Sequence, residues 1–164
     1  MKTILYSPFP IPQIKQLFEE AKSRSSCANI AMAAVIETPA GEYVMGWNGP
    51  PLRGGEHTSC RLGGPITPEN LRNCPGVHAE VRAICRAAEA GISIKGGTIY
   101  LSEWFPCAPC AMAIIEAGLD KLVVTEEPNF AKDDCYNFHL AQEYLSAAGI
   151  KIEVRIDLSS RLDG

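Results

Sequence analysis

The sequence contains no apolar run that approaches the roughly 20 residues of a membrane span. It also has no cluster of Lys and Arg, and its formal net charge is −4, which argues against a large contact surface for a polynucleotide. The first apolar stretch, residues 1–6, is too short for a signal peptide and is followed by prolines instead of a cleavage site. Internal repeats and low-complexity segments are absent. We therefore expect a cytoplasmic protein that acts on a small molecule and does not cross a membrane.

Cysteine is the residue type that stands out, because the chain has seven of them among 164 residues. An odd number cannot be fully paired in disulfides, and in a reducing compartment the expected roles of cysteine are metal binding and burial. Cys85 lies four residues after Val81 in a helical pattern, so we expect it in the core. With 46% hydrophobic residues, the chain is long enough to form one domain over residues 1–164.

Two short motifs carry the residues that suggest chemistry. His78 and Glu80 are two positions apart, and Cys107 and Cys110 are three positions apart, each cysteine directly after a proline. Cysteines at this spacing lie on one face of a helical turn, and proline is tolerated in a first turn, so this pair is expected to open a helix. At the start of a second helix, His78 and Glu80 can converge on the same point.

One histidine and two cysteines give three protein ligands for a zinc ion and leave the fourth tetrahedral position for water, as in catalytic sites. Glu80 is then the candidate general base, which would take a proton from water without ligating the metal. The alternative is a closed structural site in which a residue such as Cys74 supplies the fourth ligand. A purely structural site gives Glu80 no purpose, which favours the catalytic interpretation.

These motifs resemble the cytidine and deoxycytidylate deaminase family, whose signature pairs H-x-E with P-C-x-x-C. The resemblance is greatest to the deoxycytidylate branch and extends over about residues 23–154. It implies a zinc-dependent enzyme that converts dCMP to dUMP with release of ammonia, and a homo-oligomer. It also implies a three-layer α/β/α sandwich with a mixed five-stranded sheet. The segments that carry it, besides the two motifs, are 24–27, 46–49, 114–118 and 141–145.

The hydrophobic pattern agrees with an α/β sandwich, because helices alternate with strands after an initial hairpin, which favours parallel pairing in the later part of the sheet. Residues 1–12 hold several prolines and are expected to be an irregular lead-in, and residues 51–77 a long loop. Expected helices cover 12–24, 78–90, 107–117 and 136–148, and expected strands cover 29–36, 42–47, 98–101, 121–125 and 150–156.

The resemblance also implies where the substrate is held. Asn48 occupies the position of a sugar contact in the family, although in Asn-Gly it could also be a simple turn-former. Ser102, Glu103, Trp104 and Phe105 lie between the 98–101 strand and the expected 107–117 helix, so they are expected to line the base pocket, and Ala79 is a further candidate substrate contact. The chain departs from the family pattern at two places. Five residues separate Tyr100 from Pro106, where the family usually has four, and arginine stands in place of asparagine at position 82. These departures concern pocket shape and therefore substrate identity.

A second zinc is a further hypothesis, with Cys27, His57, Cys60 and Cys74 as ligands, because Cys27 and Cys60 match positions that carry a structural zinc in some deoxycytidylate deaminases. The alternative is that these cysteines are isolated. A metal held by four such residues would anchor the 51–77 loop.

A 5′-phosphate on the substrate would need donors near the mouth of the pocket. Candidate donors are Arg24, Ser25, Ser26, Asn48, Arg53 and the amides of Gly54 and Gly55. Features that oppose an anion are Phe130, where relatives often have a tyrosine, and the carboxylates Glu56 and Glu103. Other possible substrates are a free nucleoside, a base or another amino-heterocycle, and less favoured a tRNA adenosine. The non-enzymatic alternative is a zinc-stabilised binding module or an inactive relative.

Overall fold

The computed structural model describes residues 5–9, 12–27, 29–52, 67–72 and 74–157. They form a mixed six-stranded sheet with strand order β1-β6-β5-β4-β2-β3. The strands are β1 (Leu5–Phe9), β2 (Ala33–Glu37), β3 (Tyr43–Trp47), β4 (Thr98–Leu101), β5 (Lys121–Val124) and β6 (Lys151–Asp157). The helices are α1 (Pro12–Ser23), α2 (Pro68–Arg72), α3 (Ala79–Ala90), α4 (Ala108–Glu116), α5 (Asp133–Tyr136) and α6 (Phe138–Ala147), and a 3-10 turn covers Phe130–Lys132.

The sheet is antiparallel in one half and parallel in the other. β2 pairs antiparallel with both β3 and β4, while β4, β5, β6 and β1 run parallel to one another. The antiparallel half comes from the hairpin that the turn residues 38–41 predict, and the parallel half from the helical crossovers α4 and α6. The α/β sandwich with a mixed sheet is thus confirmed.

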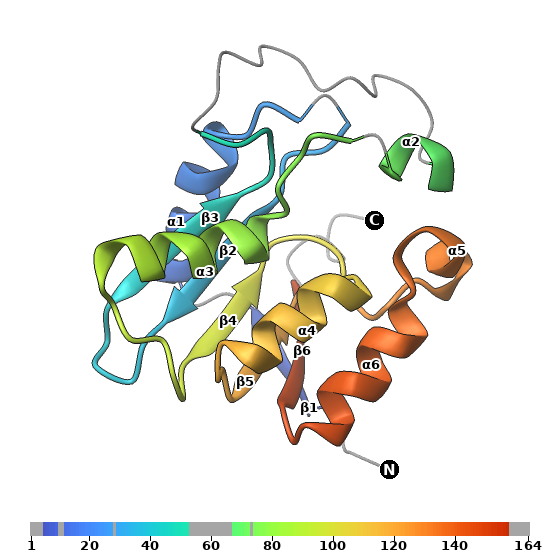
Figure 1. Cartoon of the computed structure of the whole chain (residues 1–164). Coiled ribbons are helices and arrows are strands. Elements are labelled where there is room, and N and C mark those ends of the chain that lie inside the picture. The colour runs from blue at the N-terminus through green and yellow to red at the C-terminus, as the bar shows by residue number, and fades with distance from the viewer. Residues whose placement is uncertain (1–4, 10–11, 28, 53–66, 73, 158–164) are drawn as a thin grey trace.

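Helices cover both faces of the sheet and give three layers (Figure 1). On one face, α1 buries Ile14, Phe18 and Ala21 in a cluster with Val35 and Val123. On the other face, α3, α4 and α6 lie beside one another over a larger core. The apolar spacing that predicts each helix is therefore the spacing that faces the sheet.

The expected irregular lead-in was wrong in part, because its residues 5–9 form β1. This strand pairs parallel with β6 from Leu5 opposite Glu153 to Phe9 opposite Asp157. It contains one proline, Pro8, which is compatible with an edge strand, where a missing N–H can face outward. The sheet therefore has the five expected strands and one more at its parallel edge.

The two helices that follow the motifs begin where the sequence predicts, within one residue. His78 is the N-cap of α3 and Cys107 is the N-cap of α4, and both have extended backbone. Gly91 ends α3 in the left-handed conformation, with φ 69°, which glycine adopts without steric cost. Cys85 was wrongly expected in the core, because it lies on the exposed face of α3. Among the helices of the described residues, none has the length and apolar character needed to cross a membrane.

Candidate active site

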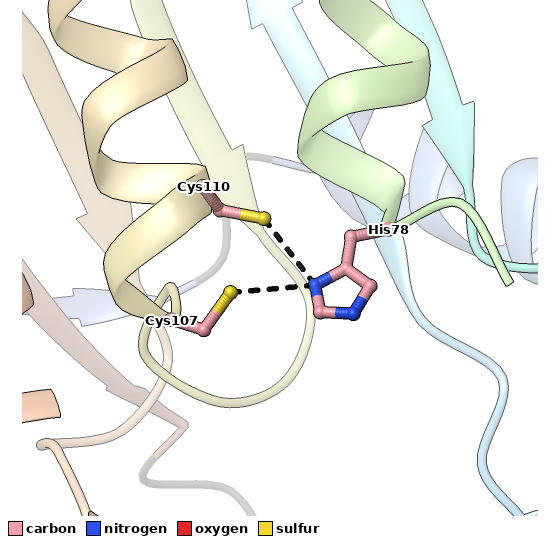
Figure 2. Close-up of side chains that lie close together, drawn as sticks. All are labelled: His78, Cys107 and Cys110. Carbon is pink, nitrogen blue, oxygen red and sulfur yellow. Dashed lines mark hydrogen bonds between the residues drawn. The ribbon is translucent and has the colours of Figure 1, made fainter. Parts of the chain in front are cut away.

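The two motifs meet because they lie at the starts of α3 and α4, two helices on the same face of the sheet. Figure 2 shows His78 at the beginning of α3 with its ring directed toward Cys107 and Cys110 on the first turn of α4. The extended backbone at both N-caps turns these side chains out of the helices and toward the space between them. Pro109 lies in the first turn of α4, where its missing N–H has no helical partner to lose.

The three side chains form a compact set of potential ligands, which we call the metal trio (His78, Cys107 and Cys110). Nδ1 of His78 lies 3.4 Å from Sγ of Cys107 and 3.3 Å from Sγ of Cys110. All three ligand atoms lie within 4.8 Å of one another. Tetrahedral zinc bonds of about 2.0–2.3 Å place neighbouring ligand atoms roughly 3.5 Å apart, so the trio fits zinc. Among the described residues, Cys74 is not part of this group.

The trio's protonation states are coupled through these contacts. The hydrogen bond with Cys107 raises the pKa of His78 to about 9, against the opposing effect of burial. The hydrogen bond from Cys110, helped by the one from His78, lowers the pKa of Cys107 to about 5. The neighbouring Cys107 and burial raise the pKa of Cys110. In the absence of metal, these directions favour an imidazolium at His78, a thiolate at Cys107 and a thiol at Cys110 at neutral pH.

Glu80 lies in the first turn of α3 and is only 5% exposed. Burial raises the pKa of this carboxyl above its ordinary value, and the charge of His78 opposes that rise. A carboxyl whose pKa is moved toward neutrality can both take and return a proton. The geometry therefore places a candidate proton carrier beside the metal trio and outside it.

A cavity opens beside His78 and Cys107 of the trio, and its lining comes from five separate parts of the chain. Asn48, Ala79 and Trp104 line it, as the sequence analysis expects for substrate contacts, while Ser102 does not. The lining residues are Cys27, Asn29, Ile30, Met32, Asn48, Gly49, Pro50, Cys74, Pro75, Gly76, Val77, His78, Ala79, Glu80, Trp104, Phe105, Cys107 and Tyr136.

Asn48 has both a structural role in its turn and a place in the cavity lining, where a sugar contact is expected. Its Oδ1 accepts hydrogen bonds from the Ser25 hydroxyl at 2.6 Å and from the Met32 amide at 2.8 Å. Its Nδ2 donates to the carbonyl of Ile30 at 2.8 Å. The side chain thus holds three segments together at the end of β3, and one N–H of its amide group is left for a ligand.

Ser102 and Glu103 are turned toward structural partners. The Ser102 hydroxyl accepts a hydrogen bond from the Ala33 amide at 2.9 Å, which extends the contact between β4 and β2. Glu103 pairs with Lys22 of α1 at 2.6 Å and is not among the described cavity residues. The expected pocket role of Ser102 is therefore not supported by its contacts, and Glu103 does not oppose an anion from the cavity wall.

The proposed second zinc site falls only partly within the described residues. Cys27 and Cys74 both line the cavity, whereas His57 and Cys60 lie outside the described residues. Burial, with the nearby charges of cysteines including Cys27 and Cys74, raises the pKa of Tyr136 to about 12. Cys27, Cys74 and Tyr136 thus share one cavity, and the second zinc stays a prediction.

The candidate phosphate donors have mixed positions. Arg24 pairs with Glu20 one turn earlier in the chain at 2.9 Å, and the Ser25 hydroxyl is bonded to Asn48. Arg53, Glu56 and the Gly54-Gly55 pair lie outside the described residues. Phe130 stacks on His139 at 3.9 Å between ring centroids, away from the described cavity lining.

Sequence reasoning missed two residues of this region. Tyr136 closes the cavity opposite Trp104, with ring centroids 5.4 Å apart in an edge-to-face arrangement. Its signal was weak, because α5 is only four residues long and has no clear periodicity. Arg82 was noticed only as a departure from the family pattern, yet it is buried beneath the cavity wall.

Comparison with known proteins identifies the region that holds the site. Residues 13–126 match the family model described as the cytidine and deoxycytidylate deaminase zinc-binding region. ComE operon protein 2 from Bacillus subtilis (strain 168) is 30% identical over 132 residues, which are 79% of this chain and 62% of that protein. The deoxycytidylate deaminase of Enterobacteria phage T2 is 48% identical over 50 residues, 30% of this chain and 26% of the phage protein. The chain matches less than two thirds of the length of each relative.

The fold has a solved counterpart of nearly the same extent. The crystal structure of dCMP deaminase from the cyanophage S-TIM5 in complex with dCMP and dUMP superposes with a TM-score of 0.65 and 25% sequence identity. The superposition covers 89% of this chain and 99% of the cyanophage chain.

Proposed function

The chain belongs to the family of the cytidine and deoxycytidylate deaminase zinc-binding region, and we propose that it deaminates deoxycytidylate to deoxyuridylate by zinc-dependent hydrolysis. The observation that carries this proposal is the buried Glu80 beside the metal trio at the base of a cavity. A closed structural zinc site has no use for such a carboxylate. The reaction exchanges the exocyclic amine of cytosine for oxygen and releases ammonia.

His78, Cys107 and Cys110 would hold the zinc ion, which when bound supplies Lewis-acid activation of water. Glu80 takes one proton of the attacking water, whose oxygen bonds to the amine-bearing ring carbon, and passes that proton to the ring nitrogen of the base. It then moves the proton that remains on the added hydroxyl to the exocyclic amine, so that the C–N bond breaks, ammonia leaves and the ring carbon keeps a carbonyl oxygen. Burial assists both steps, since it raises the pKa of Glu80 toward that of the groups with which it exchanges protons.

The upper part of the cavity is suited to a flat base with a sugar attached. Trp104 and Tyr136 offer aromatic surface, and Ala79 leaves room beside the trio because its side chain is small. The remaining N–H of Asn48 can donate to a sugar hydroxyl at the rim. These features favour a nucleoside unit as the ligand, because a free base alone would leave part of the cavity unfilled.

Support for the 5′-phosphate comes from the relatives. The cyanophage structure that shares this fold is of a dCMP deaminase with dCMP and dUMP. Glu103, which could repel an anion, is neutralised by Lys22. Arg24 and Ser25 stand at the end of α1 near the Asn48 side of the cavity, where Ser25 already contacts Asn48.

One observation favours an uncharged substrate as the second candidate. None of the described residues that line the cavity is Lys or Arg. Arg24, the cation among the described candidate donors, is engaged with Glu20. A nucleoside or another amino-heterocycle would need no such donor.

The experiment that tests the proposal is ammonia release by the zinc-loaded protein from a panel of amines, with the zinc-stripped protein as the matched control. The panel holds deoxycytidylate, cytidylate, deoxycytidine, cytosine and adenine compounds. Zinc-dependent turnover of deoxycytidylate above the other amines supports the proposal. Zinc-dependent turnover of a different amine moves the protein to the second candidate, and a protein that binds zinc without turnover of any amine is a binding module or an inactive relative.

A further inference from the structure

Arg82 is a buried cation whose partners are main-chain carbonyls of the cavity wall. The residue is only 5% exposed and lies on the buried face of helix α3, with Ala79 and Ala83. Its Nη2 donates to the carbonyl of Gly49 at 2.7 Å and to the carbonyl of Pro50 at 2.7 Å. Hydrogen bonds from a charged donor in a buried place are the strong ones, so this contact is expected to restrain the segment that it holds.

The restrained segment is the cavity wall, which we define as residues 48–50. All three residues line the cavity. Gly49 also forms a two-way bridge with Val77, with N–O distances of 3.2 and 2.7 Å. Gly49 has φ 146°, a backbone conformation that residues with a side chain rarely adopt. The direction of its carbonyl therefore depends on glycine at this position and on Arg82, which donates to that carbonyl.

The other end of this contact belongs to the helix that carries the chemistry. Arg82 is on the same helix as Glu80, and its amide donates to the carbonyl of His78 at 3.0 Å. Helix and strand are held tightly there, because a Cβ on Gly46 of β3 would lie 2.2 Å from the carbonyl oxygen of Ala79. The Arg82 guanidinium lies 5.4 Å from the ring centroid of Trp47, which limits its movement. Arg82 thus spans the distance between the catalytic helix and the wall.

We infer that Arg82 is a positioning residue that sets the distance between the cavity wall and the start of α3, and so determines affinity for the sugar-bearing part of the substrate. It acts through the carbonyls of Gly49 and Pro50 and does not itself touch the substrate. The inference rests on the proposed function, because it assumes that Asn48 at the head of the wall meets the sugar. It predicts an effect on KM and on substrate choice, with the proton transfer by Glu80 left intact.

Arg86 offers a matched control on the same helix. It lies one turn further along α3, and its guanidinium is 4.9 Å from the same Trp47 ring. Its described contacts include no hydrogen bond to the wall, and its Nε has no hydrogen-bond partner among the described residues. Arg86→Met therefore removes a similar side chain and a similar charge near Trp47 while the wall contact stays.

The test is steady-state kinetics of the zinc-loaded full chain, with wild type, Arg82→Met, Arg82→Lys and Arg86→Met compared on deoxycytidylate. Arg82→Met is expected to raise KM about tenfold or more and to change kcat less than about threefold, with zinc content unchanged. Arg82→Lys, which keeps one donor for the carbonyls, is expected to fall between wild type and Arg82→Met. Equal KM values in Arg82→Met and Arg86→Met, or a loss confined to kcat, would overturn the inference.

A second measurement separates this inference from the proposed function. Hydrogen exchange at the amides of Gly49 and Val77 reports the wall without any substrate, and it should accelerate in the Arg82 variants and stay at the wild-type rate in Arg86→Met. If wild type acts on another amine, the substrate assignment fails, and the same kinetic comparison is made on that amine. If Arg82→Met does not fold, Arg82→Lys carries the exchange test. Unchanged exchange in the Arg82 variants contradicts the positioning role whatever the substrate.

Discussion

The base of the cavity and its wall are built by different means. At the base, the metal trio and Glu80 come from two helix starts, and each pair of residues lies within three positions in the chain. At the wall, residues 48–50 are held by contacts from distant segments, through Ser25 and Ile30 on one side and Arg82 on the other. Each half of the base is thus fixed by a helix start, and the fold has only to bring two starts together, whereas the wall depends on contacts from several segments.

This difference explains how separate functions can be changed separately. Substitutions at the base should alter zinc binding or proton transfer and leave the fold in place. Substitutions around the wall should alter which molecule is accepted and how tightly. The predictions below test that division, beginning with the largest expected effect.

Glu80→Gln should lower kcat by about 100- to 10,000-fold, because it removes the group that carries the proton and keeps the size of the side chain. Zinc content and thermal stability should stay near wild type, since Glu80 is not part of the metal trio. The measurement is kcat for ammonia release together with zinc analysis of the same samples.

Glu103→Gln is the matched control for this change. Glu103 is also a carboxylate and is adjacent in sequence to Trp104 of the cavity lining, but it pairs with Lys22 and is absent from the described lining itself. Its kcat should stay within about threefold of wild type, because an exposed or half-exposed ion pair contributes little. Near-normal turnover in Glu80→Gln would rule out the assigned proton carrier.

Zinc binding should release about two protons per ion near pH 7. With the pKa of His78 at about 9 and that of Cys110 raised, both hold protons that zinc must displace, whereas Cys107, with a pKa of about 5, has already lost its own. Affinity should therefore rise about 100-fold per pH unit between pH 6 and 8 and less steeply above pH 9.

Calorimetry of zinc binding in buffers of different ionisation enthalpy counts these protons. Cys110→Ser is the matched variant, because it keeps the other two members of the trio and should release about one proton fewer while binding zinc more weakly. A zinc affinity that does not change between pH 6 and 8 would contradict the coupled protonation of the trio.

The base of the cavity could be predicted from the sequence, whereas its wall could not. The trio and Glu80 could be predicted because a helix start determines where residues two or three positions apart point, and the residues 75–80 and 106–110 mark both starts. The strands and helices of the core followed from periodic apolar residues. β1 was missed because the prolines of residues 1–12 outweighed a pattern of only five residues, and its partner β6 is at the other end of the chain.

The wall could not be predicted for a related reason. Nothing near Gly49 in the sequence indicates that a residue 33 positions later on a helix will bind its carbonyl. Ser102 was expected in the pocket because it follows β4, but a hydroxyl at that place can equally bond the neighbouring strand, and it does so with Ala33. Such choices depend on tertiary contacts that a local pattern does not contain.

The smallest expected effect concerns the proposed second zinc. Loss of one of its ligands should lower the metal content from two zinc ions per chain to one. If Cys27 and Cys74 act with His57 and Cys60 as ligands, Cys27→Ser should lose one zinc and keep turnover better than a change in the trio. Cys85→Ser is the matched control, because Cys85 is exposed on α3. Metal analysis that finds one zinc in wild type would end this hypothesis.

The most direct test of the central claim is the ratio of kcat/KM for deoxycytidylate and deoxycytidine, measured with the zinc-loaded full chain under the same conditions. Loss of one or two charge-assisted hydrogen bonds to the phosphate should reduce kcat/KM for the nucleoside at least about tenfold. A ratio of ten or more in favour of deoxycytidylate is the result that the account predicts. Equal values, or a preference for deoxycytidine, would contradict it.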